Sequence, residues 1–334
     1  MDWSKGYSAA YYMQRVDPAT WRDIGLIQVT GGSIKRMSTG KRESADVDCV
    51  GIDIGVEQWV RIYLDASQDG STAHVALFTG LATSPAKDID GVVTKSTLTC
   101  YSVLKPCEDV DLPLGWYAPA GASGGEVIRS LLTASPAPVV IADSSPTLTS
   151  AIVAEGNENH LTMIDKILSA MGWRIRIDGD GTVNVEPKPV DAAVVFDPLS
   201  NDVIETKIKL SADWYSCPNV YRATSGDVTG IARDEDPDSA LSTVGRGREV
   251  WKSESGVNLA STESIAQYAA RKLKEAQQVK QTASYDRRYY PGLVPGDRVQ
   301  MHYPEQGLSG VFTIESQTTK LGHGGTTSEQ VTSI

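Results

Sequence analysis

The sequence predicts a mainly β fold with a small α+β insertion. Residues 20–105 alternate apolar and polar side chains with period two, residues 115–190 contain two amphipathic helical stripes, and strands return after about residue 200. At 334 residues the chain is too long for one ordinary core, so two or three domains are expected. The expected domains are 1–112, 113–198 and 199–334, with the insertion in the middle.

The N-terminal domain is predicted from its strands and turns. The stretches SADVDCVGIDIG and EQWVRIYLD alternate, SQDGST interrupts the pattern, and HVALFTGLA resumes it. A further strand follows in STLTCYSVL, and no convincing helix separates these segments. Short strands joined by turns are typical of a small barrel or sandwich.

The middle domain begins after a Gly/Pro/Ala-rich loop, LPLGWYAPAGASGG. Ser123, followed three residues later by Glu126, forms a capping box that predicts the start of a helix. ASPAPVVIADSSP predicts one short strand. A second helix follows, capped by Asn157 or Asn159 and ended by Gly172. WRIRID and TVNVEP, on either side of GDG, then predict a β-hairpin.

The C-terminal domain is predicted to contain strands in DVIETKIKLS and NVYRATS, a loop-like segment over 226–251 and a long helix over 262–279. After the helix, PGLVPGDRVQMHYP places two Pro-Gly pairs before an alternating strand. Proline fixes φ, and glycine permits backbone angles that other residues resist. The expected structural turn consists of Pro291, Gly292, Pro295 and Gly296.

The two β-rich ends share a weak internal repeat. EQWVRIYLD, a Gly-containing turn and HVALFTG follow the same order of pattern as GDRVQMHYP, a Gly-containing turn and GVFTIES. Val60 then corresponds to Val299, and Ile62 to Met301. Any two β-hairpins alternate, so the pattern leaves both duplication of one barrel-like unit and chance open.

The charge of the chain limits its partners. The formal net charge is −11 and the pI about 4.9, so the surface repels phosphate backbones and stable binding of nucleic acid is not expected. The N-terminus lacks the basic and apolar regions of a signal peptide, and no stretch approaches the ~18 apolar residues of a membrane span. We expect neither signal-peptide export nor stable membrane insertion.

The spacing of cysteines and histidines predicts no metal or disulfide site. Without a C-x-x-C pair, the expected state of the cysteines is the buried free thiol, and the histidines lack H-x-x-x-H or H-E-x-x-H spacing. The residues concerned are Cys49, Cys100, Cys107, Cys217, His74, His160, His302 and His323. DGDGTVN resembles a calcium loop, but Val183 replaces the required glycine and no glutamate stands at the twelfth position, so a hairpin turn is expected. The acidic run RDEDPD is expected to be a solvated loop.

The strongest catalytic candidate is GASGG, residues 121–125, which matches the G-x-S-x-G nucleophile elbow. That motif needs an apolar strand directly before it, whereas GWYAPA is a proline-containing loop. The capping role of Ser123 explains the same residues without chemistry. The 42 acidic residues neither single out nor exclude a carboxylate pair for glycan cleavage. No catalytic, cofactor-binding or metal-binding residue is assigned.

Four stretches, in this order, resemble the tail (baseplate) hub proteins of bacteriophages and phage-like particles. They are VDPATWRDIGLIQVTGGSIKRMSTGKRESADVDC; VRIYLDASQDG with ALFTGLATSP and YSVLKP; HLTMIDKILSAMGWRIRIDGDGTVNVEP; and NVYRATSG with SIAQYAARKLKEAQ and PGLVPGDRVQMHYPEQGLSGVFTIES. Together they span nearly the whole chain.

The resemblance implies two tube-like β-barrel domains flanking the α/β insertion, each barrel with an associated helix. It implies a homotrimer whose six barrels form a pseudo-hexameric ring, with tail tube or distal tail protein rings above and spike, fibre or tip proteins below. The Pro291–Gly296 turn would then set the corner between the outer helix and a strand of the second barrel.

Such a protein belongs to the virion tail, is assembled in the host bacterial cytoplasm and lines the channel through which phage DNA passes without specific binding. Neither enzymatic activity nor a cofactor is expected, because nothing in the sequence nominates a nucleophile, a base or a cofactor cradle. The C-terminal extension that carries a fibre or lytic domain in some tail proteins is not expected here, so that activity is not carried over. Two alternatives stay open: a tail-associated peptidoglycan hydrolase, and a receptor- or carbohydrate-binding protein of the tail tip.

Overall fold

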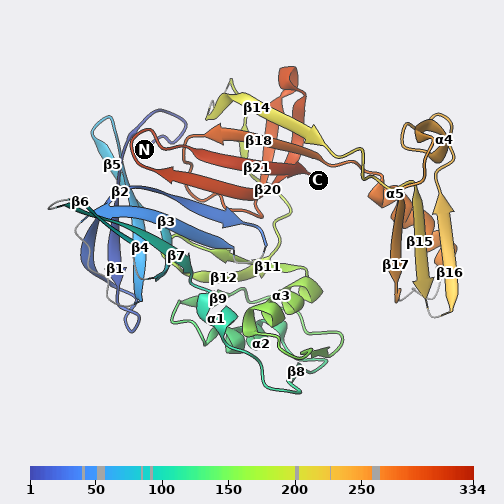
Figure 1. Cartoon of the computed structure of the whole chain (residues 1–334), viewed down its shortest axis with the longest axis horizontal. Coiled ribbons are helices and arrows are strands. Elements are labelled where there is room, and N and C mark those ends of the chain that lie inside the picture. Colours follow the sequence, from blue (N-terminus) through green and yellow to red (C-terminus); the bar gives the residue numbers. More distant parts are fainter. Residues whose placement is uncertain are drawn as a thin grey trace. The chain divides into compact units, whose positions relative to one another are not determined.

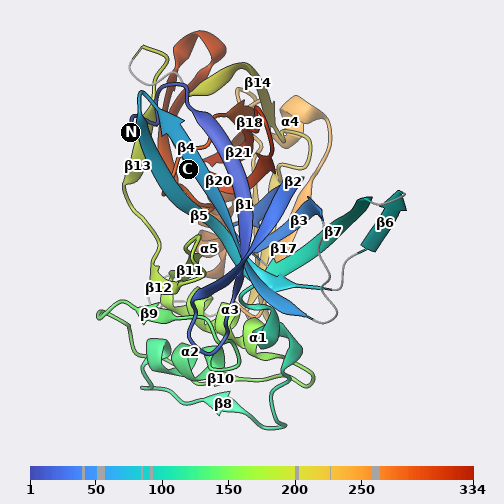
Figure 2. The same ribbon diagram turned by 90° about the vertical axis from the view of Figure 1, so that its left-hand side faces the viewer.

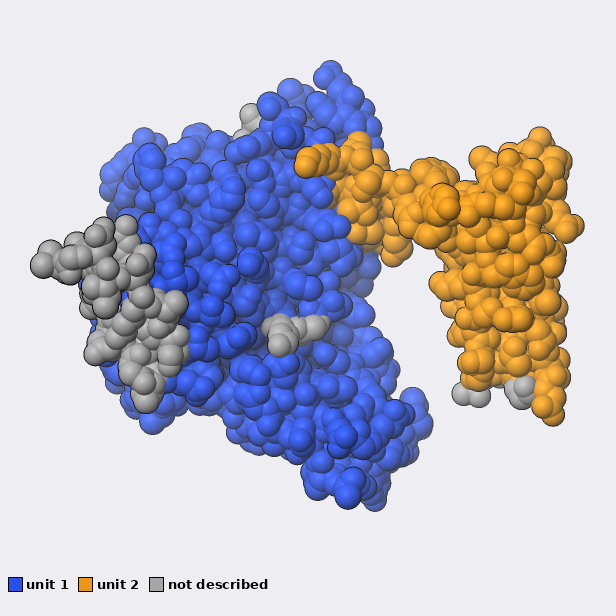
Figure 3. Space-filling model, viewed as in Figure 1, with its two compact units in different colours: residues 1–208, 284–331 blue, residues 209–283, 332–334 orange. Residues whose placement is uncertain are grey.

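A computed structural model describes residues 1–39, 42–50, 57–83, 86–90, 93–199, 203–225, 227–257 and 264–334 of the chain. Of these described residues, 49% lie in strands and 15% in helices, which confirms the expected mainly β class. The chain divides into two compact units (Figure 3). The first unit consists of residues 1–208 and 284–331, and the second of residues 209–283 and 332–334.

Six strands of the first unit pair in a closed ring (Figure 2). They are β1 (Ser8–Val16), β2 (Asp23–Met37), β3 (Glu43–Val50), β4 (Gln58–Gln68), β5 (Ser71–Ala82) and β7 (Val93–Ser102). The pairing order is β1–β4–β5–β7–β3–β2, and β2 pairs again with β1. A short strand, β6 (Ala86–Asp90), pairs with β7. Closure gives every strand of the ring two neighbours, which removes the free edges that invite uncontrolled pairing.

The interior of this ring forms one hydrophobic core. Met13 from β1 and Val60 and Ile62 from β4 are fully buried in it. Burying a side chain of this size contributes roughly 1.5–3 kcal/mol relative to leaving it exposed. Arg61, between Val60 and Ile62, and Tyr63, directly after Ile62, are also buried. Two polar side chains buried at alternate positions of a strand indicate that other segments cover this part of it.

The insertion packs helices onto a small sheet below the ring (Figure 1). Its elements are α1 (Lys105–Asp109), β8 (Tyr117–Ala118), α2 (Gly124–Leu132), β9 (Val139–Ile141), β10 (Ile152–Val153), α3 (His160–Met171), β11 (Trp173–Ile177) and β12 (Val183–Pro187). The sheet has the order β11–β12–β9, with β12 antiparallel to β11 and parallel to β9. The hairpin expected around GDG is confirmed.

Local signals fix the ends of α3. The Asn159 side chain accepts a hydrogen bond from the Thr162 N–H at 2.9 Å, so Asn159 and not Asn157 is the cap. Gly172 ends the helix with φ of 67°, a left-handed conformation that glycine adopts without steric cost. The Leu161, Ile164 stripe of α3 is buried between these ends.

The remaining strands of the first unit form a sheet attached to the ring. They include β13 (Ala192–Phe196), β14 (Ile204–Ala212), β18 (Gln281–Arg287), β19 (Arg298–Tyr303), β20 (Leu308–Leu321) and β21 (Thr327–Ser333), with a 3-10 turn η1 (Pro304–Gln306). Their pairing order is β13–β19–β20–β21–β18–β14. Because β20 also pairs with β2, this sheet continues directly into the ring.

A buried polar cluster holds three of these strands together. The Glu329 carboxylate of β21 accepts hydrogen bonds from Tyr285 Oη at 2.8 Å and Gln317 Nε2 at 2.7 Å, and it pairs with Arg287. All four side chains are buried. Gln317 Nε2 also donates to the Leu293 carbonyl at 3.1 Å. Charged groups are buried at low cost only when paired and bonded in this way.

The second unit packs one helix on a three-stranded sheet. Its elements are β15 (Val220–Ser225), β16 (Val228–Arg233), α4 (Thr243–Arg246), β17 (Trp251–Ser255) and α5 (Ile265–Ala276), and the sheet order is β16–β15–β17. Tyr221 and Ala223 of β15 and Ala269 and Leu273 of α5 form the core. The helix α5 begins directly after its cap, Ser264.

Two expectations for this region were wrong. The helix expected over 262–279 ends at Ala276, because the chain extends soon afterwards into β18; positions 262 and 263 lie outside the described residues. The segment 226–251, expected as a loop, contains β16 and α4. Gly230 concealed β16 in the sequence. A Cβ at this position would lie 2.5 Å from the Ile265 carbonyl oxygen, so glycine is required where the helix start meets the strand.

Candidate functional site

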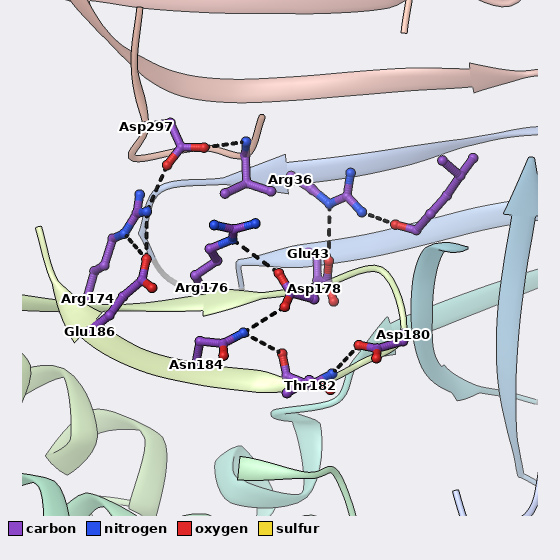
Figure 4. Close-up of polar contacts among 12 residues, drawn as sticks. Arg36, Glu43, Arg174, Arg176, Asp178, Asp180, Thr182, Asn184, Glu186 and Asp297 are labelled. Atoms are coloured by element: carbon purple, nitrogen blue, oxygen red, sulfur yellow. Dashed lines mark hydrogen bonds and ion pairs between the residues drawn. The ribbon is translucent and has the colours of Figure 1, made fainter. Parts of the chain in front are cut away.

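Three parts of the first unit meet at a cluster of charged side chains (Figure 4). We call this cluster the polar junction; it comprises Arg36, Glu43, Arg174, Arg176, Asp178, Glu186 and Asp297. The first two come from the β2–β3 pair of the ring, the next four from the β11–β12 hairpin, and the last from the turn before β19. The junction therefore connects segments far apart in sequence.

Arg174 bridges two of these parts. Its Nη2 donates to Asp297 Oδ1 at 2.7 Å and to Glu186 Oε1 at 2.7 Å, and its Nε donates to Glu186 Oε1 at 3.0 Å. Asp297 Oδ2 accepts from the Val294 N–H at 2.9 Å. Asp297 is buried, so this ion pair is shielded from solvent and holds the hairpin to the turn.

The turn before β19 contains the four residues expected to form it. Gly292 and Gly296 have φ of 82° and 91°, each directly after a proline. The Asp297 N–H donates to the Val294 carbonyl at 3.1 Å, which with Pro295 and Gly296 gives the pattern of a type II turn. A Cβ on Gly296 would lie 3.1 Å from Arg174 Nη1, whereas one on Gly292 would meet nothing within 4 Å.

Glu43 is a buried carboxyl group of the junction. Its Oε2 accepts from Arg36 Nε at 3.3 Å, and the Arg36 guanidinium also bonds the Leu77 carbonyl. Burial raises the pKa of Glu43 to about 7, the charge of Arg36 opposes this shift, and nearby Asp178 adds to it. Asp178 in turn lies 3.1 Å from Arg176 Nε and accepts from Asn184 Nδ2 at 2.9 Å.

The tip of the β11–β12 hairpin, residues 178–182, docks onto the ring; we call it the docking turn. The Asp180 carbonyl accepts from Trp21 Nε1 and from Arg61 Nη2, both at 2.9 Å, and the Gly179 carbonyl accepts from Thr79 Oγ1 at 2.8 Å. A Cβ on Gly179 would lie 1.9 Å from the Ala76 carbonyl oxygen. Gly179 thus permits the close approach of two backbones, whereas a Cβ on Gly181 would meet the side chains of Trp21 and Thr79.

Arg61 is the side chain of the ring that receives the docking turn. Besides Asp180, it donates to Thr79 Oγ1 and Asp23 Oδ1, both at 2.9 Å. Tyr63 donates to the other oxygen of Asp23 at 2.6 Å. These contacts explain why polar positions of β4 are buried.

Ser123 and Glu126 lie at the start of α2, away from the junction elements. Ser123 Oγ accepts from the Glu126 N–H at 3.5 Å, and within the described residues no histidine bonds the hydroxyl. The glycines beside it serve packing: a Cβ on Gly124 would lie 2.2 Å from Met171 Sδ, and one on Gly125 would lie 2.6 Å from Ser145 Oγ. Packing and capping account for GASGG.

Other candidate chemistry is sparse in the described part of the chain. No group of three or more His, Cys, Asp or Glu residues gathers there as metal ligands would. All four cysteines are free and buried, as expected. No helix of the described residues is long and apolar enough to cross a membrane. A cavity of about 380 Å³ lies between the ring and α1, with a lining that combines Met37, Leu104 and Leu161 with Lys35 and Lys105.

Comparison with known proteins finds no match for the sequence but several for the fold. No protein-family model and no curated protein matches the chain. Among solved structures, a tail protein of Neisseria meningitidis MC58 aligns with a TM-score of 0.66 at 16% identity, covering 98% of this chain and 97% of that one. The 43 kDa tail protein of prophage MuSo2 from Shewanella oneidensis aligns with a TM-score of 0.65 at 11% identity, covering 97% of both chains.

The chain has the phage tail-protein fold. A third structure, the prophage tail protein gp18 of Listeria monocytogenes EGD-e, aligns with a TM-score of 0.54 at 13% identity over 96% of this chain and 94% of that one. Alignment over nearly the whole length of three tail proteins confirms the resemblance to phage tail proteins that the sequence indicated.

Sequence reasoning missed the polar junction within this tail-protein fold. One signal was available: the hairpin register around GDG places Arg174 opposite Glu186, and opposite charges at paired positions indicate an ion pair. Arg36 and Glu43 are likewise paired across β2 and β3. Asp297, the other carboxylate partner of Arg174, had no such local signal, because it lies 123 positions from Arg174 in the sequence.

Proposed function

We propose that this chain is a structural tail hub protein of a bacteriophage or phage-like particle. Three copies form a pseudo-hexameric ring that joins the tail tube to the tail tip and lines the DNA ejection channel. The observation that carries this proposal is the tail-protein fold, which extends over 98% of the chain in the comparison with the Neisseria protein. In such a hub, tail tube or distal tail rings stack above and spike, fibre or tip proteins below.

The first unit has two strand sets, the six-stranded ring and the sheet attached to it. They support the two tube-like barrels that a pseudo-hexameric trimer needs. β4–β5 and β19–β20 are both antiparallel hairpins, and the four positions matched in the internal repeat are fully buried. These positions are Val60, Ile62, Val299 and Met301. Two strand sets of similar pairing per chain would let three chains present six similar surfaces to a sixfold tube.

The pairing of β2 with β20 joins the ring to the attached sheet and supplies the fixed angle between them that pseudo-sixfold symmetry requires. Gly32–Met37 of β2 pair continuously with Ser316–Leu321 of β20. The polar junction and docking turn then fasten the insertion to both sets. On this proposal the Pro-Gly turn serves geometry alone, and the function needs no chemical step.

The acidic balance of the chain suits a channel for DNA. Carboxylates facing the bore repel the phosphate backbone, so DNA passes without adhering during ejection. The formal net charge of −11 motivates this part of the proposal. The protein is then a virion tail component, assembled in the host bacterial cytoplasm.

Imaging of the intact particle tests the proposal. The expected result is one ring of three copies on the tail axis, with six similar barrels around an acidic bore. Six copies, an off-axis position or a basic bore would contradict it. A zymogram on peptidoglycan tests the non-enzymatic role: no cleared band is expected, and a band that disappears in Ser123→Ala would reassign the chain as a hydrolase.

A further inference from the structure

Two exposed aromatic side chains lie beside two arginines in the second unit. Trp214 and Tyr215 are 56% and 77% exposed, and with Ala240, Leu241, Arg246 and Arg248 they line a shallow hollow of about 520 Å³. We call these six residues the aromatic–arginine patch. All of them belong to the second unit. Neighbouring exposed aromatic residues on a monomer mark interaction surfaces more often than isolated ones do.

The patch is held rigidly. The Arg246 guanidinium donates to the carbonyl oxygens of Cys217 at 2.6 Å and Tyr215 at 2.8 Å, and also bonds that of Trp214. Arg248 Nη2 donates to the Tyr215 carbonyl at 2.7 Å, and its guanidinium lies 4.2 Å from the centre of the Tyr215 ring. A rigid aromatic surface loses little conformational entropy on binding.

The composition of the patch is that of a protein-binding hot spot. Trp, Tyr and Arg are the residues that most often dominate binding energy at interfaces. The two guanidinium groups bond carbonyl oxygens. Together with hydrogen bonds from Ser216, the charge of Arg246 contributes to lowering the pKa of the neighbouring Asp213, so two arginines face one nearby carboxylate. The patch therefore presents positive charge that an acidic partner surface can complement.

The rest of the chain supplies such an acidic surface. Residues 209–283 contain ten Lys or Arg and ten Asp or Glu, so the formal net charge of −11 falls entirely on the other residues. We call residues 1–208 and 284–331 the acidic body. A cationic patch repels a copy of itself across a twofold axis, so a contact with the acidic body must join two different surfaces. A heterologous contact generates a closed ring when the rotation between copies closes, as it does in a trimer, and an open filament when it does not.

We propose that the aromatic–arginine patch of one copy binds the acidic body of a second copy. This inference rests on the proposed trimeric hub and adds the surface that closes its ring. Trp214 and Tyr215 provide the apolar contact, while Arg246 and Arg248 provide charge complementarity and orientation. Because the charges at the rim are exposed, added salt weakens the association.

Sedimentation of the full chain over a concentration series tests this contact. The wild-type chain is expected to self-associate, and the double variant Trp214→Ala/Tyr215→Ala to raise the dissociation constant at least tenfold. Arg248→Glu is also expected to weaken association, and the effect is expected to be larger at low salt than at high salt. The matched control is Val228→Ala, which truncates an exposed apolar side chain of the second unit outside the patch and is expected to leave association unchanged. Circular dichroism and thermal melting establish that each variant folds.

The outcomes separate this inference from the hub proposal. Equal self-association of the double variant and the wild type would overturn the patch contact, whereas the hub proposal would still be decided by particle imaging. Loss of particle incorporation without loss of self-association would assign the patch to a different tail protein, which also overturns it. A wild-type chain that stays monomeric at every concentration contradicts the contact as well.

Discussion

Arg174 in β11 and Asp297 before β19 form a buried ion pair with a 2.7 Å contact across 123 positions of sequence. Arg174 belongs to the insertion and Asp297 to the sheet that continues into the ring. Glu186 and the Val294 N–H complete the hydrogen bonding of the pair. This contact fixes the insertion against the Pro-Gly turn, so its loss is expected to affect the first unit as a whole.

Asp297→Ala tests this pair. The substitution leaves Arg174, whose side chain is 12% exposed, with one carboxylate partner in place of two and removes the acceptor of the Val294 N–H. The expected loss in the free energy of unfolding is about 2–4 kcal/mol, measured by urea denaturation of the first unit. The control Asp143→Ala removes an exposed carboxylate of the same unit and is expected to change little. Equal effects would show that the pair does not stabilise the fold.

The two glycines of the turn provide a second, matched test. Alanine at either position adopts an unfavourable positive φ, which costs on the order of 1–3 kcal/mol. Only at Gly296 would the added Cβ also press on Arg174, at 3.1 Å from Nη1. Gly296→Ala is therefore expected to lower the melting temperature more than Gly292→Ala. The reverse order would mean that the contact with Arg174 does not constrain the turn.

Local patterns predicted most elements, and their failures have physical causes. The strand β1 was not predicted, because Tyr11 and Tyr12 are adjacent and both aromatic although only Tyr11 packs against the ring's core. Gly230 interrupted the alternation of β16, since its missing side chain is required by α5 and not by the strand. In both cases the deciding contact lies outside the local segment.

In the candidate site, too, some features follow from the local sequence and others depend on tertiary contacts. The positive φ of Gly292 and Gly296 follows from Pro-Gly chemistry, and the Arg174–Glu186 pairing follows from the hairpin register. The role of Gly179 does not, because its neighbour Ala76 lies on a strand of the ring about a hundred positions away. Motifs predict turns, whereas the partner of a turn depends on tertiary packing.

Gly179→Ala tests the docking turn. A Cβ would lie 1.9 Å from the Ala76 carbonyl oxygen, a backbone atom that cannot move without disturbing β5. The docking turn must then withdraw and lose its hydrogen bonds from Trp21 and Arg61, so a loss of at least about 2 kcal/mol in the free energy of unfolding is expected. Gly156→Ala, where a Cβ meets nothing within 4 Å, is the control. Similar melting curves for the two variants would contradict the docking.

The raised pKa of Glu43 predicts how the stability of the first unit depends on pH. Its pKa of about 7 in the folded chain lies above the ordinary 4.5, so the folded state binds the proton more tightly than the unfolded state. The stabilisation is complete below pH 4.5 and is lost as the pH rises to about 7, by roughly 3 kcal/mol if Glu43 acts alone. Glu43→Gln, which stays neutral throughout, is expected to flatten this part of the profile, measured by urea denaturation at a series of pH values. The control Glu305→Gln changes an exposed carboxyl of the same unit and is expected to keep the wild-type slope. An unchanged slope in Glu43→Gln would mean that another group titrates.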